Sequence, residues 1–280
     1  MKYRTILMAA LVIVVTGACS SLKKQPARTE GYDIFLLIGQ SNMAGRGVME
    51  AGDDAPIDGV WILDGQDRIV PASEPLNQYS TVRKKIGMQR YNLGDSFARS
   101  IHKRSGRKIL LVVNARGGTT LERWLKGAKP ALFNKREGDD PEKIGSPMPG
   151  LYDEAVRRTR IAMQYGTLKA ILWHQGEGDS SPQKLAVYLE RLSGMASDLR
   201  KDLGVGNGVP FIAGELNYAR KGSDRFNPEL RRIGEYIPNG WWVSAEGCGV
   251  NPDKTHFSRE GLILFGEHYA DVVWDKVYKE

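Results

Sequence analysis

The feature that most constrains this 280-residue chain is an unbroken apolar run, Ile34 to Ile38, which stops at a small polar segment. A continuous run of this kind is typical of a strand buried on both faces, as found in parallel α/β sheets. Ligands bind at the carboxyl ends of such strands. Ser41, in the segment Gly39 to Gly45, is therefore predicted at the sheet edge where a site would lie. The alternative for this serine is an ordinary helix cap or turn.

A catalytic serine needs a base, and the segment Asp253 to His256 offers one near the C-terminus. Residues three apart can face each other in a turn, so the Asp253 carboxylate can accept the Nδ1 proton of His256. Nε2 of His256 would then be free to take the proton of Ser41. The alternative is that Asp253 and His256 cap and begin the C-terminal helix.

Four blocks of the sequence occur in the order found in SGNH-type hydrolases, namely Gly39 to Gly45, Gly117 to Thr120, Trp173 to Asp179 and Asp253 to His256. The chain most resembles the sialate O-acetylesterase-like branch, which includes the acetylxylan esterases of carbohydrate esterase family six. This resemblance implies a flavodoxin-like, three-layer α/β/α sandwich over residues 31–280 that hydrolyses acetyl esters on sugars. It also implies that Ser41 is the nucleophile and that Asp253 and His256 complete the triad.

Acyl transfer requires hydrogen-bond donors aimed at the oxyanion of the tetrahedral intermediate, each worth about 3 kcal/mol in the barrier. The candidates are the backbone N–H groups of Ser41 and of Gly117 or Gly118, and the side-chain amide of Gln175. Glycine lets the backbone come close to a substrate. The alternatives are a plain strand-to-helix turn at the two glycines and a pairing of Gln175 with loop backbone.

Other residues near these blocks are predicted to support the site or to contact the substrate. Glu177 and Asp179 are interpreted as carboxylates that hold loops and orient donors, because the triad already has its acid. Arg116 and Arg46 flank the predicted site and could pair with a sialic or uronic carboxylate. The remaining members of this set are Gln40, Asn42 and Trp124.

The segment 127–150 is rich in Gly, Pro, Lys and Asp, and it is too long for an ordinary connection. Loops of this length are often functional. We expect it to form one wall of the sugar site together with Trp124 and residues 77–91. The alternative is a disordered surface insertion.

Alternating apolar and amphipathic segments predict a five-stranded parallel sheet with helical crossovers. The strands are expected at residues 32–38, 109–114, 168–174, 209–214 and 241–245. The helices are expected at residues 93–104, 151–165, 183–201, 229–236 and 259–277. Asp64-Gly65 between two short apolar runs predicts a small β-hairpin excursion from this sheet.

The sequence offers little sign of a metal, a cofactor or a nucleic-acid partner. The four histidines are scattered, and neither Cys-x-x-Cys nor His-Glu-x-x-His occurs, so we predict no metal site and no cofactor. The net charge of +7 comes from dispersed basic residues, which is typical of solvated helix faces rather than of a nucleic-acid groove. Cys19 and Cys248 are too few for a disulfide framework.

The N-terminus has the pattern of a secretory signal. Lys2 and Arg4 precede an apolar run, Ile6 to Val15, which has the right length for a signal peptide and is too short to span a bilayer comfortably.

The next four residues, Thr16 to Cys19, resemble a bacterial lipobox with Thr16 in place of the usual aliphatic residue. This resemblance implies a signal peptide over residues 1–18 and a lipidated Cys19, followed by a flexible tether to residue 30, which together anchor the protein to a membrane. Ser20 favours the outer membrane of the bacterial cell envelope. The alternative is cleavage by the ordinary signal peptidase, which leaves a periplasmic or secreted protein.

The predicted activity is that of a serine esterase that removes O-acetyl groups from a carbohydrate through an acetyl-enzyme intermediate. Its substrate is expected to be an acetylated xylan-type glycan or an O-acetyl sialic acid. The alternatives are another SGNH activity, such as that of a lipase, thioesterase or glycan O-acyltransferase, and a non-catalytic glycan-binding lipoprotein. The last is disfavoured because every nucleophile, donor and base position is filled.

Overall fold

The apolar run forms β1 (Tyr32–Gly39), the central strand of the computed structural model, which describes residues 31–279. Parallel strands lie on both sides of β1, namely β4 (Ile109–Ala115) and β7 (Gly166–His174), and Ile34 to Ile38 are fully buried. The predicted signal peptide, lipidated Cys19 and tether lie outside the described residues.

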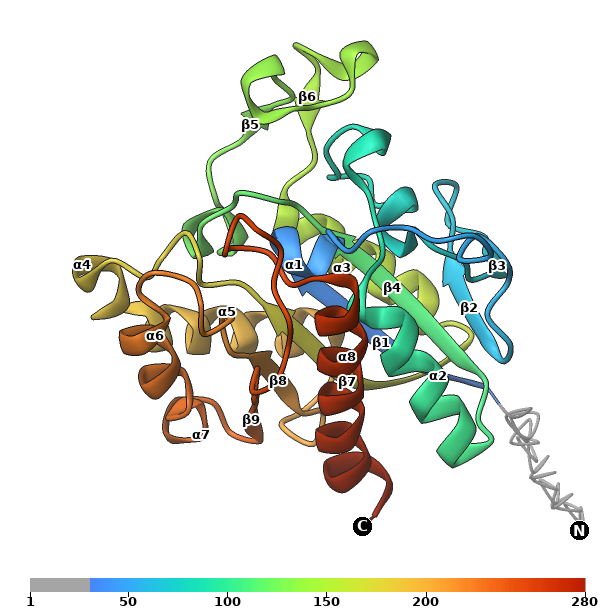
Figure 1. Cartoon of the computed structure of the whole chain (residues 1–280). Helices are drawn as coiled ribbons and strands as arrows, with labels where there is room; N and C mark the ends of the chain where they lie inside the picture. The colour runs from blue at the N-terminus through green and yellow to red at the C-terminus, as the bar shows by residue number, and fades with distance from the viewer. Residues whose placement is uncertain (1–30, 280) are drawn as a thin grey trace, which may run out of the picture. The chain divides into compact units, whose positions relative to one another are not determined.

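The strands β8 (Phe211–Gly214) and β9 (Gly240–Val243) continue the parallel sheet beyond β7. The five predicted strands are therefore all present, in the spatial order β4-β1-β7-β8-β9. Numbered along the chain among themselves, these five follow the order 2-1-3-4-5 of flavodoxin-like folds, whose ligand site lies where the strand order reverses, beside the first strand. The helices run alongside the sheet in Figure 1.

The predicted five-strand count is wrong, because the hairpin belongs to the same sheet. β2 (Val60–Leu63) pairs in parallel with β4, and β3 (Ile69–Pro71) pairs antiparallel with β2. Within residues 31–279 the main sheet thus has seven strands, in the order β3-β2-β4-β1-β7-β8-β9. Val60 and Ile62 are buried, so the hairpin buries its apolar side chains by extending the sheet rather than by leaving it.

Helices cover both faces of the sheet and bury the side chains of β1, which point alternately to opposite sides. Ile34, Leu36 and Ile38 belong to a hydrophobic cluster that includes residues of α3 (Leu151–Ala162) and α5 (Tyr188–Leu203). Phe35 and Leu37 belong to a second cluster with residues of α2 (Leu93–Ser105) and α8 (Arg259–Val273). The chain is a mixed α/β fold around a mostly parallel sheet.

Three helix predictions differ from the structure. The segment expected as one helix at 183–201 is divided into α4 (Pro182–Leu185) and α5, with Val187 between them in a non-helical conformation. The helix expected at 229–236 is two short helices, α6 (Ser223–Leu230) and α7 (Ile233–Tyr236). The α8 helix ends at Val273 and continues as one π-helical turn, η6 (Trp274–Tyr278).

The segment 127–150, called the insert below, is folded in the structure. It contains the short hairpin β5 (Ala131–Leu132) and β6 (Pro147–Met148), with the 3-10 turns η4 (Lys135–Glu137) and η5 (Pro141–Lys143) between its strands. It extends from the carboxyl-end side of the sheet at the top of Figure 1.

The remaining short elements lie in the loops that connect the strands and helices of the main sheet. They are α1 (Ser41–Ala44), η1 (Leu76–Tyr79), η2 (Ile86–Met88) and η3 (Leu121–Trp124). As for membrane spans, the helices within residues 31–279 include none with the length and apolar character to cross a bilayer.

Candidate active site

Ser41 is the first residue of α1, the single turn that follows β1 at its carboxyl end. Gly39 makes this turn possible, since a Cβ at its φ of 141° would lie 2.0 Å from the carbonyl oxygen of His174 on β7. The next backbone N–H, that of Gln40, donates to the same oxygen at 2.9 Å. The chain therefore leaves the sheet at one fixed point, with Ser41 at its edge.

The structure brings the three predicted triad residues together. His256 Nε2 lies 2.9 Å from Ser41 Oγ, and His256 Nδ1 lies 2.6 Å from Asp253 Oδ2. The other carboxylate oxygen of Asp253 accepts the backbone N–H groups of Thr255 and His256 at 2.8 and 2.9 Å. Burial acts to raise the pKa of Asp253, but the hydrogen bonds from His256 and Thr255 outweigh it and lower the pKa to about 2. The carboxylate is thus charged and orients the imidazole.

Asn42, next to the serine, holds the backbone on both sides of His256. Its Nδ2 donates to the carbonyl oxygen of Thr255 at 3.2 Å, and its Oδ1 accepts the N–H of Phe257 at 3.1 Å. Nδ2 also donates to Glu177 Oε1 at 2.5 Å, and the Asn42 side chain is fully buried. One side chain therefore ties the nucleophile's turn to the loop that carries the base.

Ser41 and His256 open into a pocket of about 380 Å³ at the carboxyl edge of the sheet. Three basic side chains contribute to its wall, and Glu177 is the acidic one among the lining residues of the described chain. The lining consists of Gln40, Ser41, Arg46, Lys84, Met88, Gly117, Gly118, Glu177, Gly178, Arg220, Thr255 and His256.

Gly117 and Gly118 lie beside the serine, where the sequence predicts oxyanion donors. A Cβ at Gly117 would stand 3.4 Å from Ser41 Cβ and 2.7 Å from Arg46 Nη2. Gly118 has a φ of 74°, which a residue with a side chain rarely adopts. The missing side chains leave the backbone of this turn open to the pocket.

Gln175 does not have its predicted role of oxyanion donor, because its side-chain amide is hydrogen-bonded within the protein and does not line the pocket. It is fully buried, and its Nε2 has acceptors in Gln40 Oε1 at 3.1 Å, Thr119 O at 3.1 Å and Asp179 Oδ2 at 2.6 Å. Gln40 lines the pocket above it, and within residues 31–279 the Nε2 group of Gln40 has no hydrogen-bond acceptor. The donor chemistry sought at Gln175 is thus available at Gln40, whose signal in the sequence is its place directly before the serine.

The carboxylates of the third block support loops in the structure. Asp179 Oδ2 accepts the backbone N–H of Leu121 at 2.8 Å as well as the Gln175 amide. Glu177 accepts the Asn42 amide, and its main-chain oxygen accepts Arg220 Nη2 at 2.6 Å. His174, in contrast, is fully buried beneath this loop and contacts the Glu215 carbonyl oxygen at 3.0 Å through Nε2.

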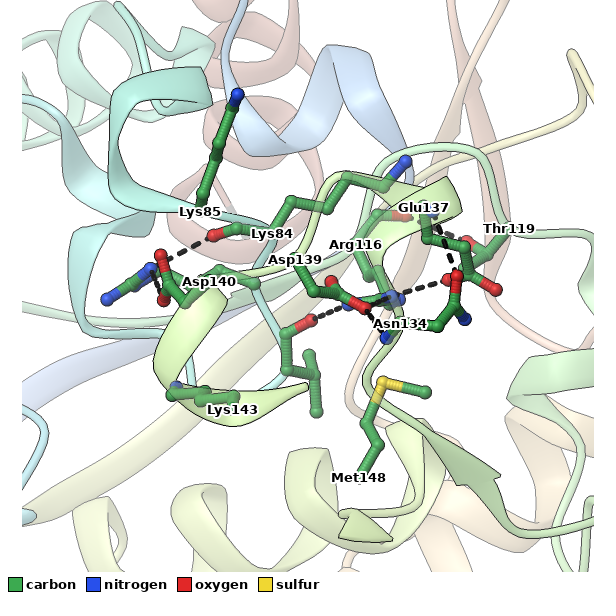
Figure 2. A network of polar contacts seen from close by, with 12 residues as sticks. Lys84, Lys85, Arg116, Thr119, Asn134, Glu137, Asp139, Asp140, Lys143 and Met148 are labelled. Atoms are coloured by element: carbon green, nitrogen blue, oxygen red, sulfur yellow. Dashed lines mark hydrogen bonds and ion pairs between the residues drawn. The ribbon is translucent and has the colours of Figure 1, made fainter. Parts of the chain in front are cut away.

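Arg116 and Trp124 do not reach the pocket, so their predicted contacts with substrate are wrong. Arg116 has no exposed surface and forms a two-point ion pair with Asp139 of the insert, with N–O distances of 2.9 Å. It also pairs with Glu137 and donates to Val82 O at 2.9 Å; Figure 2 shows this network. Trp124 is fully buried, and its Nε1 donates to Thr119 Oγ1 at 3.0 Å.

The insert itself contributes none of the lining residues found within residues 31–279. It packs behind the segment 83–89, which supplies Lys84 and Met88 to the pocket wall. The Lys85 backbone N–H donates to Gly138 O at 3.0 Å, and Arg83 pairs with Asp140 at 2.6 Å. The predicted wall is thus formed by part of residues 77–91, and the insert supports it from outside.

Arg220 is a lining residue that sequence reasoning missed. It donates to Glu177 O and, at 3.2 Å, to Thr255 Oγ1, and so joins the loops after β7 and β9. The only signal available was its position a few residues beyond β8, at the edge where all the parallel strands end. For metals, the described part of the chain holds no cluster of three or more His, Cys, Asp or Glu side chains suited to an ion.

Known proteins resemble this chain in sequence and in fold. A protein named probable carbohydrate esterase from Arabidopsis thaliana is 27% identical over 252 residues, which cover 83% of this chain and 86% of that protein. A crystal structure of an Arabidopsis thaliana protein superposes with a TM-score of 0.72 at 24% identity, covering 88% of this chain and 98% of that one.

Two further solved structures share the fold. NanS has a TM-score of 0.64 at 17% identity and covers 88% of this chain and 97% of its own. A carbohydrate acetylesterase from Xanthomonas citri has a TM-score of 0.60 at 17% identity, covering 89% of this chain and 57% of its own. The family model described as carbohydrate esterase, sialic acid-specific acetylesterase, matches residues 31–275. The chain therefore belongs to this family of carbohydrate esterases.

Proposed function

We propose that this protein is a serine esterase that removes O-acetyl groups from carbohydrates through an acetyl-enzyme intermediate. The observation that carries the proposal is the chain of contacts from Asp253 to His256 and from His256 to Ser41, at 2.6 and 2.9 Å, beside an open pocket. A nucleophile, a base within hydrogen-bond reach and an orienting group are the requirements of this chemistry.

In the first half-reaction, His256 Nε2 takes the proton of Ser41 as the hydroxyl oxygen attacks the acetyl carbonyl carbon. The negative charge that develops on the carbonyl oxygen is stabilised by the backbone N–H groups of Ser41 and of Gly117 or Gly118, and by the Gln40 amide in place of Gln175. Asp253 stabilises the imidazolium that forms. His256 then returns the proton to the sugar oxygen, which leaves as an alcohol.

In the second half-reaction, water replaces the sugar beside His256. The imidazole takes a proton from this water as it attacks the acetyl group on Ser41, and a second oxyanion occupies the same donors. Collapse of this intermediate returns the proton from His256 to Ser41 Oγ and releases acetate. The enzyme is then ready for another substrate.

The charge of the pocket favours an acidic sugar as the substrate. Arg46, Lys84 and Arg220 line it, and the Glu177 carboxylate is held by Asn42. An excess of positive charge in a cleft attracts anionic substrates. We therefore place O-acetyl sialic acid ahead of neutral acetylated xylan.

Substitution of the nucleophile tests the proposal. Ser41→Ala should fold like the wild type by circular dichroism and lose about 10⁴-fold or more in kcat on acetyl esters, because the alcohol that forms the intermediate is gone. Ser181→Ala, an exposed serine that makes no side-chain capping bond, is the matched control and should keep full activity. Turnover should be measured on O-acetyl sialic acid, acetylated xylan and p-nitrophenyl acetate. A Ser41→Ala protein with wild-type turnover would rule out the mechanism.

A further inference from the structure

We infer that Lys84 is a further catalytic residue, whose ammonium group contacts the acetyl carbonyl oxygen as that oxygen becomes negatively charged. The inference rests on the proposed esterase function and adds a side-chain cation to the backbone donors of the oxyanion site. Four observations support it: the position of the ammonium, its lack of a partner, the charges around it, and the rigid backbone from which it extends.

The position of Lys84 is beside the turn that carries the predicted donors. It lines the same pocket as Ser41 and His256. Its Nζ lies 3.4 Å from the point where a Cβ of Gly118 would stand. A carbonyl oxygen that accepts from the backbone of this turn would therefore lie within reach of the ammonium.

The ammonium of Lys84 is half-buried and unpaired. Across residues 31–279 it makes no hydrogen bond or ion pair with another side chain or carbonyl oxygen. Taking a cation out of water without a partner is unfavourable, and such groups are usually paired. A negative charge that arrives during the reaction would supply the missing partner.

The charges around Lys84 also favour the binding of an anion at its ammonium group. Burial lowers the pKa of Lys84, and the Arg116 and Arg46 guanidinium groups lower it further, against the opposing effect of Glu137 and Asp139. Both of those carboxylates already pair with Arg116. Positive charge is therefore in excess around Lys84, and an oxyanion bound there would relieve it.

The main chain at Lys84 is held in place, so the ammonium extends from a fixed position. The Lys84 carbonyl oxygen accepts Arg83 Nη1 at 2.9 Å and Gln89 Nε2 at 3.2 Å. Arg83 Nη1 also donates to Asp140 of the insert at 2.6 Å. A fixed main chain limits the region that the ammonium can occupy and keeps that region beside the pocket.

Lys85 provides a matched control in the adjacent position. It is exposed and is not among the lining residues, and Figure 2 shows its side chain directed away from that of Lys84. The two lysines differ by one place in the sequence and carry the same charge. A comparison of their substitutions therefore separates contact in the pocket from a general change in surface charge.

The test compares Lys84→Met, Lys84→Arg and Lys85→Met on p-nitrophenyl acetate, a neutral ester without a sugar, and on O-acetyl sialic acid. Lys84→Met should lower kcat by about tenfold to a hundredfold with little change in KM, because the contact forms only in the transition state. Lys84→Arg should recover part of the loss, and Lys85→Met should behave as the wild type. Thermal unfolding should show that all three variants fold.

Two results would overturn the inference. One is a Lys84→Met protein with wild-type kcat on the neutral ester. The other is a loss confined to KM for acidic sugar esters, which would assign Lys84 to a substrate carboxylate instead. A wild-type protein that hydrolyses no acetyl ester would overturn the proposed function and the role of Lys84 together, so the two failures are distinguishable.

Discussion

Gly117 shows how a single position keeps the pocket open. Its backbone does not require a positive φ, so alanine is conformationally acceptable there, unlike at Gly118. What an added methyl group would meet is the tip of Arg46 at 2.7 Å and the Cβ of Ser41 at 3.4 Å. The tip of a long side chain can move, but the space next to the nucleophile cannot be restored.

Gly117→Ala should therefore fold with near-wild-type stability and lose activity. We expect a fall of about tenfold or more in kcat/KM on p-nitrophenyl acetate, since the methyl group displaces the acetyl carbonyl from the backbone donors. Gly87→Ala, in the η2 turn, is the control, because nothing lies within 4 Å of its added Cβ. Equal activity of Gly117→Ala and the control would show that the acetyl group binds elsewhere in the pocket.

The residues of the site were predictable from the sequence to different degrees. Ser41, Asp253 and His256 could be found because each occurs in a short segment whose local spacing has chemical meaning. Gln175 and Arg116 occur in equally clear segments, but a sequence does not tell whether a side chain at a strand end points into the pocket or beneath it. Lys84 comes from an irregular segment without any periodic signal.

At the scale of elements, the insert is held to the body of the chain by buried charge. Arg116, without exposed surface, pairs with Asp139 and Glu137, and Glu137 also accepts Arg123 Nη1 at 3.2 Å. Removing the charge of Glu137 leaves the buried Arg116 guanidinium with fewer carboxylate partners, and a buried charge that loses a partner destabilises the fold. The insert should therefore respond to any change in the charge of Glu137.

Lowering the pH should reduce the contribution of Glu137 to the stability of the protein. Burial acts to raise the pKa of Glu137, but Arg116 and Arg123 outweigh it and lower the pKa to about 2, against an ordinary value of 4.5. Because the folded state favours the carboxylate, its contribution to stability is present above the ordinary pKa and is lost as the pH falls towards 2. Relative to Glu137→Gln, the wild type should be more stable at neutral pH, and this advantage should shrink as the pH falls through that window.

The measurement is the free energy of unfolding in urea for both proteins at several pH values between about 7 and about 3. Glu142→Gln, an exposed carboxylate on the same insert, serves as the control and should show no such trend. A constant difference between wild type and Glu137→Gln down to the lowest pH would contradict the assigned cause.

Helices and strands could be predicted from the sequence where a local pattern of residues marks them. The five predicted strands are apolar runs, and each appears in the sheet within a few residues of its expected bounds. The hairpin at 60–70 was also locally visible, yet its pairing with β4 depends on a partner some fifty residues away that no local pattern encodes. The interruption at Val187 was hidden because residues on both sides of it have helical patterns.

At the scale of the whole molecule, the sheet sets a gradient of protection from centre to edge. β1 lies between β4 and β7 with its apolar residues fully buried, whereas β3 is an edge strand with partly exposed side chains. Backbone amide hydrogens in a strand exchange with solvent only when that segment opens, and central strands open last.

Hydrogen exchange followed by mass spectrometry should reproduce this order. Peptides from β1 and β7 should exchange last, at rates set by global unfolding, and peptides from β3 should exchange first among the strands of the main sheet. The predicted contrast is internal to one sample and needs no variant. Equal protection of β3 and β1 would mean that the hairpin and the central strands unfold as one cooperative unit.

The arrangement around Asn42 has a mechanical consequence. Thermal breathing of a protein usually changes the spacing between groups that come from distant loops. Here Asn42, in the same turn as Ser41, is hydrogen-bonded to the backbone before and after His256. A displacement of that turn therefore moves Ser41 Oγ and His256 Nε2 in the same direction. The distance between Ser41 Oγ and His256 Nε2, over which the proton moves, should therefore change little when the loop moves as a whole.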